Sequence, residues 1–416
     1  MIEYKLVCEG CQSEYHSASG LYKCSKCQGS LRVEYNFSAN DGPLTEMMRS
    51  KANQGMWNYR TLLPVQGDRA ITMGEGNTPL VKAVNLAGLV GMDHVYIKNE
   101  TLNPTGTFKD RCMSVSITKA LELKAAGVIL GSAGNAASAA AAYSTRANIP
   151  CYVLIPQVTP LERVVQTMLY GGKVIQIDGT VNDCIDMIDS VREKMGFHNV
   201  TTASVHNPYQ AEAPKTIAYE MGKQLDWEVP DWILVPIGGG GILSAIWKGY
   251  NDLYRLGLID KLPRMVGTQA DGCAAVVKAF KAGKNSSEIE NWGKPETIAA
   301  AIADPYPLDG KSALEAIYRS HGYGEWVADE EILSAQKALA GTEGIFAEPA
   351  SSTTIAGLIK LRKAEIIGPG ETAICVATGT GLKDPKLAAR NIGTPLQIKK
   401  GIPELMAAIE DYSRKS

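Results

Sequence analysis

The chain has 416 residues and a formal net charge of −2; 45% of its residues are hydrophobic and 21% are charged. This length predicts two or three domains, and the composition is ordinary for a globular protein. The near-neutral charge argues against nucleic-acid binding and a polybasic membrane role, so we expect small-molecule partners. No apolar run approaches the roughly 18 residues of a membrane span. Because the first residues also lack a signal-peptide pattern, we expect a cytoplasmic protein.

Two cysteine pairs lie close together near the start of the chain, Cys8-x-x-Cys11 and Cys24-x-x-Cys27. Pairs of this spacing on tight turns can place four thiolates at the corners of a tetrahedron, as structural zinc requires. So small a unit buries too little apolar surface to fold alone, and metal binding would supply roughly 10 to 16 kcal/mol. We therefore predict that residues 1–36 form a zinc ribbon that docks on the rest of the chain. The alternatives are a ribbon without metal or a redox-active dithiol.

From about residue 77 onward, short apolar runs alternate with longer segments of helical period. Seven of these runs are predicted as buried strands, and they begin at Val95, Gly127, Cys151, Lys173, Trp232, Met265 and Ala373. The Ala-rich segment 136–147 strongly favours a helix. Strand, loop and helix in repeated order predict an α/β fold with parallel-rich sheets flanked by helices. The charged segment 409–416 is expected to fray.

Four short strings are candidates for a ligand site. Ligands of parallel sheets bind beyond the carboxyl ends of the strands. Three of the strings follow such ends, namely Ser132–Asn135, Gly238–Gly241 and Thr378–Gly381. The fourth, Asn103–Arg111, contains a lysine.

Lys109 lies where a loop is predicted to enter a helix. A free lysine amine is mostly protonated at neutral pH. Joined to an aldehyde cofactor it becomes a covalent anchor, and once displaced it can move protons. The alternative, a surface lysine paired with Asp110, would be preferred for an isolated lysine, but the other three strings argue against it.

The tetraglycine string, Gly238, Gly239, Gly240 and Gly241, follows a predicted strand and precedes a predicted helix. Backbone amides of such a loop can close around a phosphate, and the helix N-terminus adds a favourable field. A dinucleotide site uses a similar loop. However, we find no matching acidic residue at a strand end about 20 residues further on.

Asn135 and Thr378 supply neutral polar groups. Asn135 could donate to an acceptor on a cofactor ring, cap the Ala-rich helix, or do both. Thr378 could contact a ring nitrogen, or be a turn residue. A hydroxyl would not enforce ring protonation, which suits elimination and replacement at the β or γ carbon. Together the four strings predict a pocket for pyridoxal 5'-phosphate, an electron sink for carbanions at amino-acid carbons.

The chain resembles the threonine synthases of the fold-type II pyridoxal-phosphate family from Gly74 to about Pro385. The matching strings are Gly74–Leu80, Lys98–Glu100, Asn103–Arg111, Lys215–Ala218, Glu343–Ser351 and Gly381–Pro385. The resemblance implies that Lys109 is the Schiff-base lysine, with Phe108 beside the cofactor. It also implies that Asn135 contacts the phenolic oxygen, that Gly238–Gly241 hold the phosphate and that Thr378 faces the pyridine nitrogen.

This resemblance implies a lyase of amino-acid biosynthesis that converts O-phosphohomoserine and water to L-threonine and phosphate, commonly as a homodimer. It places four residues at the substrate, namely Thr107, Ser132, Asn207 and Gln210. It further implies a large cofactor-binding domain from residues 37–120 and 205–416, and a small α/β domain from residues 121–204.

Several positions depart from the family pattern. Ala133 and Ala136 stand where hydroxyls usually bind the substrate carboxylate, and Gln210 stands where an arginine usually helps to hold the substrate phosphate. A charge-assisted donor binds phosphate more strongly than a neutral one. Either other residues, such as Arg163, bind that phosphate, or the substrate differs. The alternatives are a paralogue performing β-elimination or β-replacement on serine, threonine or O-phosphoserine, and a non-catalytic relative.

Overall fold

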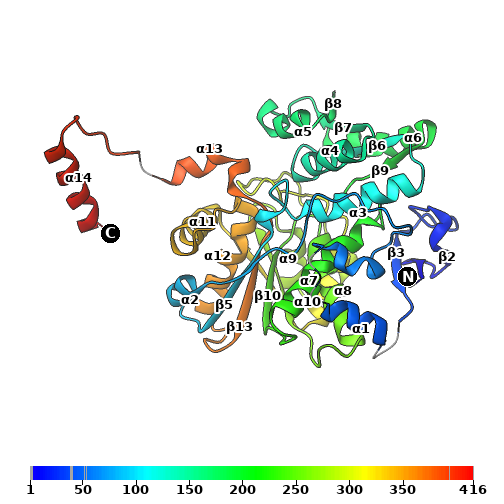
Figure 1. The fold of residues 1–416 in the computed structure, drawn as a ribbon, viewed down its shortest axis with the longest axis horizontal. Helices are drawn as coiled ribbons and strands as arrows, with labels where there is room; N and C mark the ends of the chain where they lie inside the picture. Colours follow the sequence, from blue (N-terminus) through cyan, green and yellow to red (C-terminus); the bar gives the residue numbers. More distant parts are fainter. Residues whose placement is uncertain (1–2, 38–40, 51, 53, 393, 416) are drawn as a thin grey trace.

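The computed structural model describes every residue except 1–2, 38–40, 51, 53, 393 and 416. The strands of the described residues form three sheets, of three, six and four strands. Helices flank the two larger sheets, and the three-stranded sheet lies at the side of the molecule (Figure 1). This arrangement confirms the predicted α/β fold.

The three-stranded sheet is the predicted ribbon. Its strands β1 (Tyr4–Cys8), β2 (Glu14–His16) and β3 (Leu31–Tyr35) pair antiparallel in the order β2-β1-β3. Leu6 and Val33 are fully buried and belong to the same apolar cluster as Tyr209 and Ile217 of the larger part of the chain. The ribbon therefore shares a core with that part. Helix α1 (Gly42–Arg49) follows it.

Polar contacts join the ribbon to residues next to each of the two larger sheets. The Tyr22 hydroxyl hydrogen-bonds His198 Nδ1, and Lys23 Nζ pairs with Asp189 Oδ2 at 2.8 Å. On the other side, Lys248 Nζ donates to the backbone oxygen of Val33 at 2.6 Å. The ribbon thus bridges the two halves of the molecule.

The six-stranded sheet has the order β12-β11-β10-β13-β5-β4, with β4 antiparallel and the others parallel. Ile233 and Val235 pack toward helices on one face, whereas Trp232 and Leu234 pack toward helices on the other. Burial on both faces explains why these strands are continuous apolar runs. The strands are β4 (Leu80–Lys82), β5 (His94–Asn99), β10 (Trp232–Pro236), β11 (Arg264–Ala270), β12 (Tyr323–Val327) and β13 (Thr372–Ala377).

Two groups of helices cover the faces of this sheet. One group consists of α7 (Thr216–Gln224), α8 (Gly241–Arg255), α9 (Ala275–Lys281) and α10 (Gly310–Arg319). The other consists of α2 (Val84–Val90), α11 (Asp329–Glu343) and α12 (Pro349–Lys363).

The four-stranded sheet is wholly parallel, in the order β8-β7-β6-β9. Its apolar residues pack against α3 and α4 on one face and against α6 on the other. The strands are β6 (Gly127–Gly131), β7 (Cys151–Pro156), β8 (Lys173–Ile177) and β9 (Phe197–Asn199). The helices are α3 (Lys109–Glu122), α4 (Asn135–Ala147), α5 (Val165–Leu169) and α6 (Val181–Met195).

All seven predicted strands are present, and the predicted Ala-rich helix is α4. Residues 409–415 of the segment expected to fray belong to α14 (Ile402–Lys415), and Ser416 lies outside the described residues. This helix lies apart from the rest of the molecule at the end of an extended segment that follows α13 (Pro385–Ala388) (Figure 1). None of the helices in the described part of the chain has the length and apolar character needed to cross a membrane.

Candidate active site

Lys109 is the first residue of α3 and is half-buried. Its Nζ donates to Thr202 Oγ1 at 2.9 Å and lies 4.8 Å from the centroid of the Phe108 ring. Thr107 and Phe108 attach this turn to the loop after β13, since Thr107 Oγ1 and Phe108 N donate to the Thr378 carbonyl at 3.1 and 2.9 Å. The strings Asn103–Arg111 and Thr378–Gly381 are therefore in direct contact. The Thr107 hydroxyl, predicted to contact the substrate, donates to a backbone carbonyl instead.

Gly106 makes this close approach possible. Its φ is +81°, and a Cβ there would lie 2.7 Å from Thr380 Cγ2. The Gly106 carbonyl accepts from Thr380 N at 2.9 Å. A side chain at position 106 would separate the lysine loop from the loop after β13.

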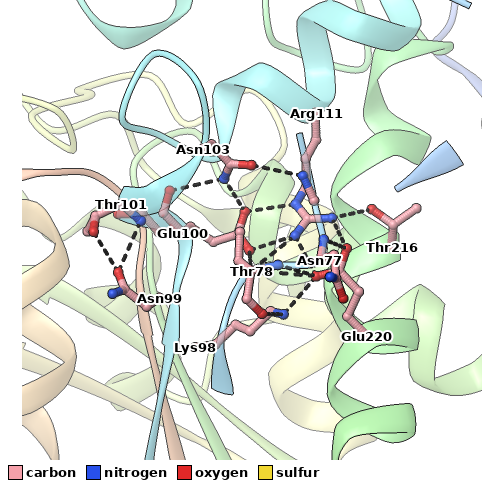
Figure 2. A network of polar contacts seen from close by, with 12 residues as sticks. Asn77, Thr78, Lys98, Asn99, Glu100, Thr101, Asn103, Arg111, Thr216 and Glu220 are labelled. Carbon is pink, nitrogen blue, oxygen red and sulfur yellow. Dashed lines mark hydrogen bonds and ion pairs between the residues drawn. The ribbon is translucent and has the colours of Figure 1, made fainter. Parts of the chain in front are cut away.

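A buried network of charges holds the start of α3 (Figure 2). The Arg111 guanidinium pairs with Glu100 Oε1 at 2.7 Å and with Glu220 Oε1 at 2.6 Å. Lys98 Nζ pairs with the other Glu220 oxygen at 2.7 Å. Burial alone would raise the pKa of Glu220, but the charges of Arg111 and Lys98 lower it to about 2. Because Arg111 lies two residues after Lys109, the network fixes the first turn of α3 against β5 and α7.

The roles of these four charged residues were not predicted from the sequence. Lys98 ends a predicted buried strand, which is an unusual place for a charged side chain. That position was the one available signal that the residue has a buried partner.

Asn135 begins α4 and reaches across to Glu348, just before α12. Its Nδ2 donates to the two Glu348 carboxylate oxygens at 3.2 and 3.1 Å. Burial raises the pKa of Glu348, and the hydrogen bond from Asn135 opposes this shift. The N-cap position is occupied by Gly134, so the capping role considered for Asn135 is wrong. Ser132 lies in the same loop and accepts from Gly134 N at 3.3 Å.

The tetraglycine loop connects β10 to α8, with Gly240 as the N-cap at φ +104°. A Cβ on Gly240 would lie 2.6 Å from the Asp309 carbonyl oxygen, so only glycine fits. The loop and the N-terminus of α8 present backbone amides without side chains in front of them, as a phosphate site requires. A Cβ on Gly238 would lie 3.2 Å from the Cα of Ile302, so this glycine packs closely against Ile302.

Two carboxylates border the same loop. A Cβ on Gly239 would lie 3.2 Å from Asp304 Oδ2, and one on Gly241 would lie 2.9 Å from Asp309 Oδ2. Burial raises the pKa of Asp304 to about 6 and also raises that of Asp309, while the charge of Lys109 opposes both shifts. With a pKa of about 6, Asp304 is mostly ionised at neutral pH and places negative charge beside the loop.

Thr378 forms a hydroxyl pair with Ser351 of α12. The two Oγ atoms are 2.9 Å apart, and either can donate. Thr378 is 4% exposed and Ser351 is 1% exposed, so the pair is sheltered from water. This arrangement offers a neutral partner to a ring nitrogen. The contribution of Ser351 was not predicted from the sequence, although it ends one of the matching strings.

Asn207 and Gln210 are not joined to these groups by any of the contacts described above. Asn207 is fully buried, and its Nδ2 donates to Ser116 Oγ at 2.8 Å and to the Asn199 carbonyl at 2.7 Å. Its Oδ1 accepts from the backbone of Tyr209 and Gln210 at 3.1 Å. Gln210 is 3% exposed. Their role at the substrate remains a prediction.

The four ribbon cysteines form a second candidate site. The Sγ atoms of Cys8, Cys11, Cys24 and Cys27 all lie within 4.8 Å of one another. The Sγ atoms of Cys8 and Cys27 are 3.4 Å apart, and those of Cys11 and Cys24 are 3.5 Å apart. The cysteines of the chain are free thiols, so these four are available as ligands.

Comparison with known proteins identifies the class of this protein. The profile of the family described as pyridoxal-phosphate dependent enzyme matches residues 71–379, which contain the lysine turn, the Asn135 loop, the tetraglycine loop and Thr378. The chain belongs to this family.

Threonine synthases are among the similar curated proteins. That of Methanocaldococcus jannaschii is 42% identical over 394 residues, which cover 94% of this chain and 96% of that protein. That of Methanosarcina acetivorans is 40% identical and covers 98% of each chain.

Solved structures share the fold at lower identity. Maize serine racemase has a TM-score of 0.64 at 21% identity and covers 81% of this chain and 93% of its own. The processed threonine deaminase isoform 2 of Solanum lycopersicum has a TM-score of 0.62 at 21% identity, with coverages of 76% and 88%. These likenesses support the predicted fold class.

Proposed function

We propose that this chain is a threonine synthase, a lyase that converts O-phosphohomoserine and water to L-threonine and phosphate. The observation that carries the proposal is the 42% identity to the threonine synthase of M. jannaschii over almost the full length of both chains. The site geometry agrees, because an amine, an amide, a hydroxyl pair and a bare glycine loop converge in one region.

Pyridoxal phosphate, when bound, withdraws electrons from the substrate carbons next to the amino group. The residues that hold it are Lys109 through its amine, Phe108 beside the ring, Asn135 through its amide, Gly238–Gly241 at the phosphate, and Thr378 with Ser351 at the ring nitrogen. These assignments rest on the positions of the side chains and on the family resemblance.

Lys109 is the group that moves protons in this proposal. Its Nζ lies at a helix start fixed by Arg111 and contacts a neutral hydroxyl, Thr202, rather than a carboxylate. The Thr378–Ser351 pair adds no charge at the ring nitrogen, which suits chemistry at the β and γ carbons.

We also propose a structural zinc ion, substrate contacts by four polar residues and a homodimeric assembly. The four ribbon thiols within 4.8 Å of one another support a structural zinc ion. Thr107, Ser132, Asn207 and Gln210 remain candidates for substrate contacts. A cytoplasmic homodimer agrees with the charge balance and with the family resemblance.

A second candidate is β-elimination or β-replacement on serine, threonine or O-phosphoserine. It is favoured by Gln210, which brings no positive charge to the position expected to meet a substrate phosphate. The experiment is to incubate the holoenzyme with O-phosphohomoserine, O-phosphoserine, serine and threonine, and to assay released phosphate and 2-oxo acid separately. We expect phosphate and threonine from O-phosphohomoserine, and neither product with Lys109→Ala. Oxo acid from serine or threonine, with O-phosphohomoserine inert, would replace our proposal by the second candidate.

A further inference from the structure

A substrate that carries both a carboxylate and a phosphate needs positive charges at the site, because charge-assisted hydrogen bonds bind such groups most strongly. The buried cations Lys98 and Arg111 already pair with carboxylates. Arg163 lies beside the Asn135 loop, with Nη2 3.9 Å from the position of a Cβ on Gly134, but it is exposed. An exposed ion pair contributes little, so Arg163 alone is a weak anion site.

Lys383 differs from these cations in its surroundings. It ends the short helix η7 (Gly381–Lys383), directly after the Thr378–Gly381 string, and is half-buried. Its Nζ donates to Gln166 Oε1 at 2.9 Å and to Ser138 Oγ at 3.3 Å. Both acceptors are neutral, so these contacts leave the ammonium charge without a compensating anion.

The position of Lys383 connects it to the cofactor and substrate loops. Its Cε lies 3.8 Å from the position of a Cβ on Gly106, in the lysine loop. Its partner Ser138 lies in the first turn of α4 and donates to the Asn135 carbonyl at 3.2 Å. Lys383 therefore lies next to both the lysine loop and the start of α4, beside the proposed cofactor site.

Two acidic residues, Glu348 and Asp110, act on Lys383 through their charge. Burial lowers the pKa of Lys383, and the charges of Glu348 and Asp110 oppose this shift. Burial also raises the pKa of Glu348, and it raises that of Asp110 to about 7. Since Gln166 and Ser138 are the hydrogen-bond acceptors that Lys383 reaches, a substrate anion would bring it a charged partner at hydrogen-bond distance.

We propose that Lys383 is a specificity-determining residue that binds an oxyanion of the substrate, either its carboxylate or its phosphate. This inference rests on the proposed function and deepens it. On binding, the ammonium group exchanges the neutral oxygens of Gln166 and Ser138 for the charged oxygens of the substrate. If the oxyanion is the phosphate, the site thereby selects phosphorylated amino acids over unphosphorylated ones.

The test compares Lys383→Met, Lys383→Gln and Lys383→Arg in the holoenzyme with the matched control Lys386→Met. Lys386 lies three residues further on, is exposed and pairs with Glu162 at 3.4 Å. We expect Lys383→Met and Lys383→Gln to raise KM for O-phosphohomoserine about tenfold or more with a smaller change in kcat, since a hydrogen bond to a charged group is lost. Lys383→Arg should restore most of the affinity, and the control should leave KM unchanged.

Two ligands distinguish the source of the oxyanion. Threonine carries the carboxylate without a phosphate, and inorganic phosphate carries no carboxylate. The dissociation constant of each ligand is measured from the absorbance of the bound cofactor, and its inhibition constant from the rate of turnover. Weaker binding of threonine alone assigns Lys383 to the carboxylate, and weaker binding of phosphate alone assigns it to the phosphate. Unchanged constants for both ligands and an unchanged KM in Lys383→Met and Lys383→Gln would overturn the inference, even with a lower melting temperature. If the wild type does not turn over O-phosphohomoserine, the proposed function fails, while the two titrations still decide the role of Lys383.

Discussion

The carboxamide of Asn135 donates to both carboxylate oxygens of Glu348, at 3.2 and 3.1 Å, across 213 residues of sequence. This contact joins α4, which packs on the four-stranded sheet, to the start of α12, which packs on the six-stranded sheet. Glu348 is 8% exposed, so little water competes with the amide. The orientation of Asn135 toward a bound cofactor therefore depends on Glu348.

Replacing Glu348 should disturb the site through Asn135. We expect Glu348→Ala to weaken pyridoxal phosphate binding or lower kcat about tenfold, because a buried amide loses its acceptor. Glu348→Gln keeps one acceptor oxygen and should retain most of both. The dissociation constant is measured by cofactor absorbance and kcat by phosphate release. Equal losses in Glu348→Ala and Glu348→Gln would show that the charge of Glu348, rather than its acceptor oxygen, is what the site requires.

Removing Arg111 should destabilise the whole enzyme. Arg111→Met leaves Glu100 and Glu220 buried without their main partner, and breaking a buried ion pair costs about 3 to 5 kcal/mol. The free energy of unfolding is measured in urea, with Lys386→Met as the exposed control, for which we expect a change below about 1 kcal/mol. A similar small loss in both variants would contradict the structural role assigned to the network.

Asp304 should make cofactor binding depend on pH. Burial raises its pKa from the ordinary value of 3.8 to about 6. Because the native state holds this proton more tightly than the unfolded chain, protonation of Asp304 stabilises the fold at low pH. This stabilisation decreases as the pH rises from about 4 to 6. Above pH 6 the carboxylate is ionised and repels a phosphate in the tetraglycine loop.

We therefore expect the dissociation constant of pyridoxal phosphate to rise more steeply between pH 5 and 7.5 in the wild type than in Asp304→Asn. Asp260→Asn, at an exposed carboxylate, provides the comparison and should follow the wild type. Parallel curves for all three proteins would refute a role for Asp304.

Metal removal should release the ribbon from the rest of the enzyme. We expect roughly one zinc ion per chain by mass spectrometry, and its loss in Cys27→Ser, because four ligands close a structural site. Without it the Tyr22–His198 and Lys23–Asp189 contacts should break, and limited proteolysis should cut within residues 1–36. Cys273→Ala, at a buried thiol outside the cluster, should keep its metal and its resistance to protease. A metal-free wild type that resists protease would exclude zinc as the support of the ribbon.

Local patterns were sufficient to predict the sheets. Apolar runs such as the one at Trp232 indicate strands that are buried on both faces of a sheet. The glycine string indicates a loop whose backbone lies close to another segment. β4, β9 and β12 were not predicted, because β4 and β9 have three residues each and β12 (Tyr323–Val327) interrupts its apolar residues with Gly324 and Glu325.

The pairings within the site could not be predicted in the same way. Asn135–Glu348 and Thr378–Ser351 join residues whose separation follows no period, so only the folded chain shows them. Asp304 arrives from an irregular segment between α9 and α10, and no local pattern connects it to the glycine loop. The positions of the buried acids around the proposed cofactor site are therefore set by tertiary structure and could not be predicted from local sequence.

The bridging position of the ribbon has a consequence for how the chain matures. Tyr22 precedes His198 by 176 residues, and Val33 precedes Lys248 by 215 residues. A metal ion can close the ribbon on the ribosome while both partners are still untranslated. We expect the ribbon to fold first as a small unit and to dock only after its partners, up to Lys248, have been synthesised.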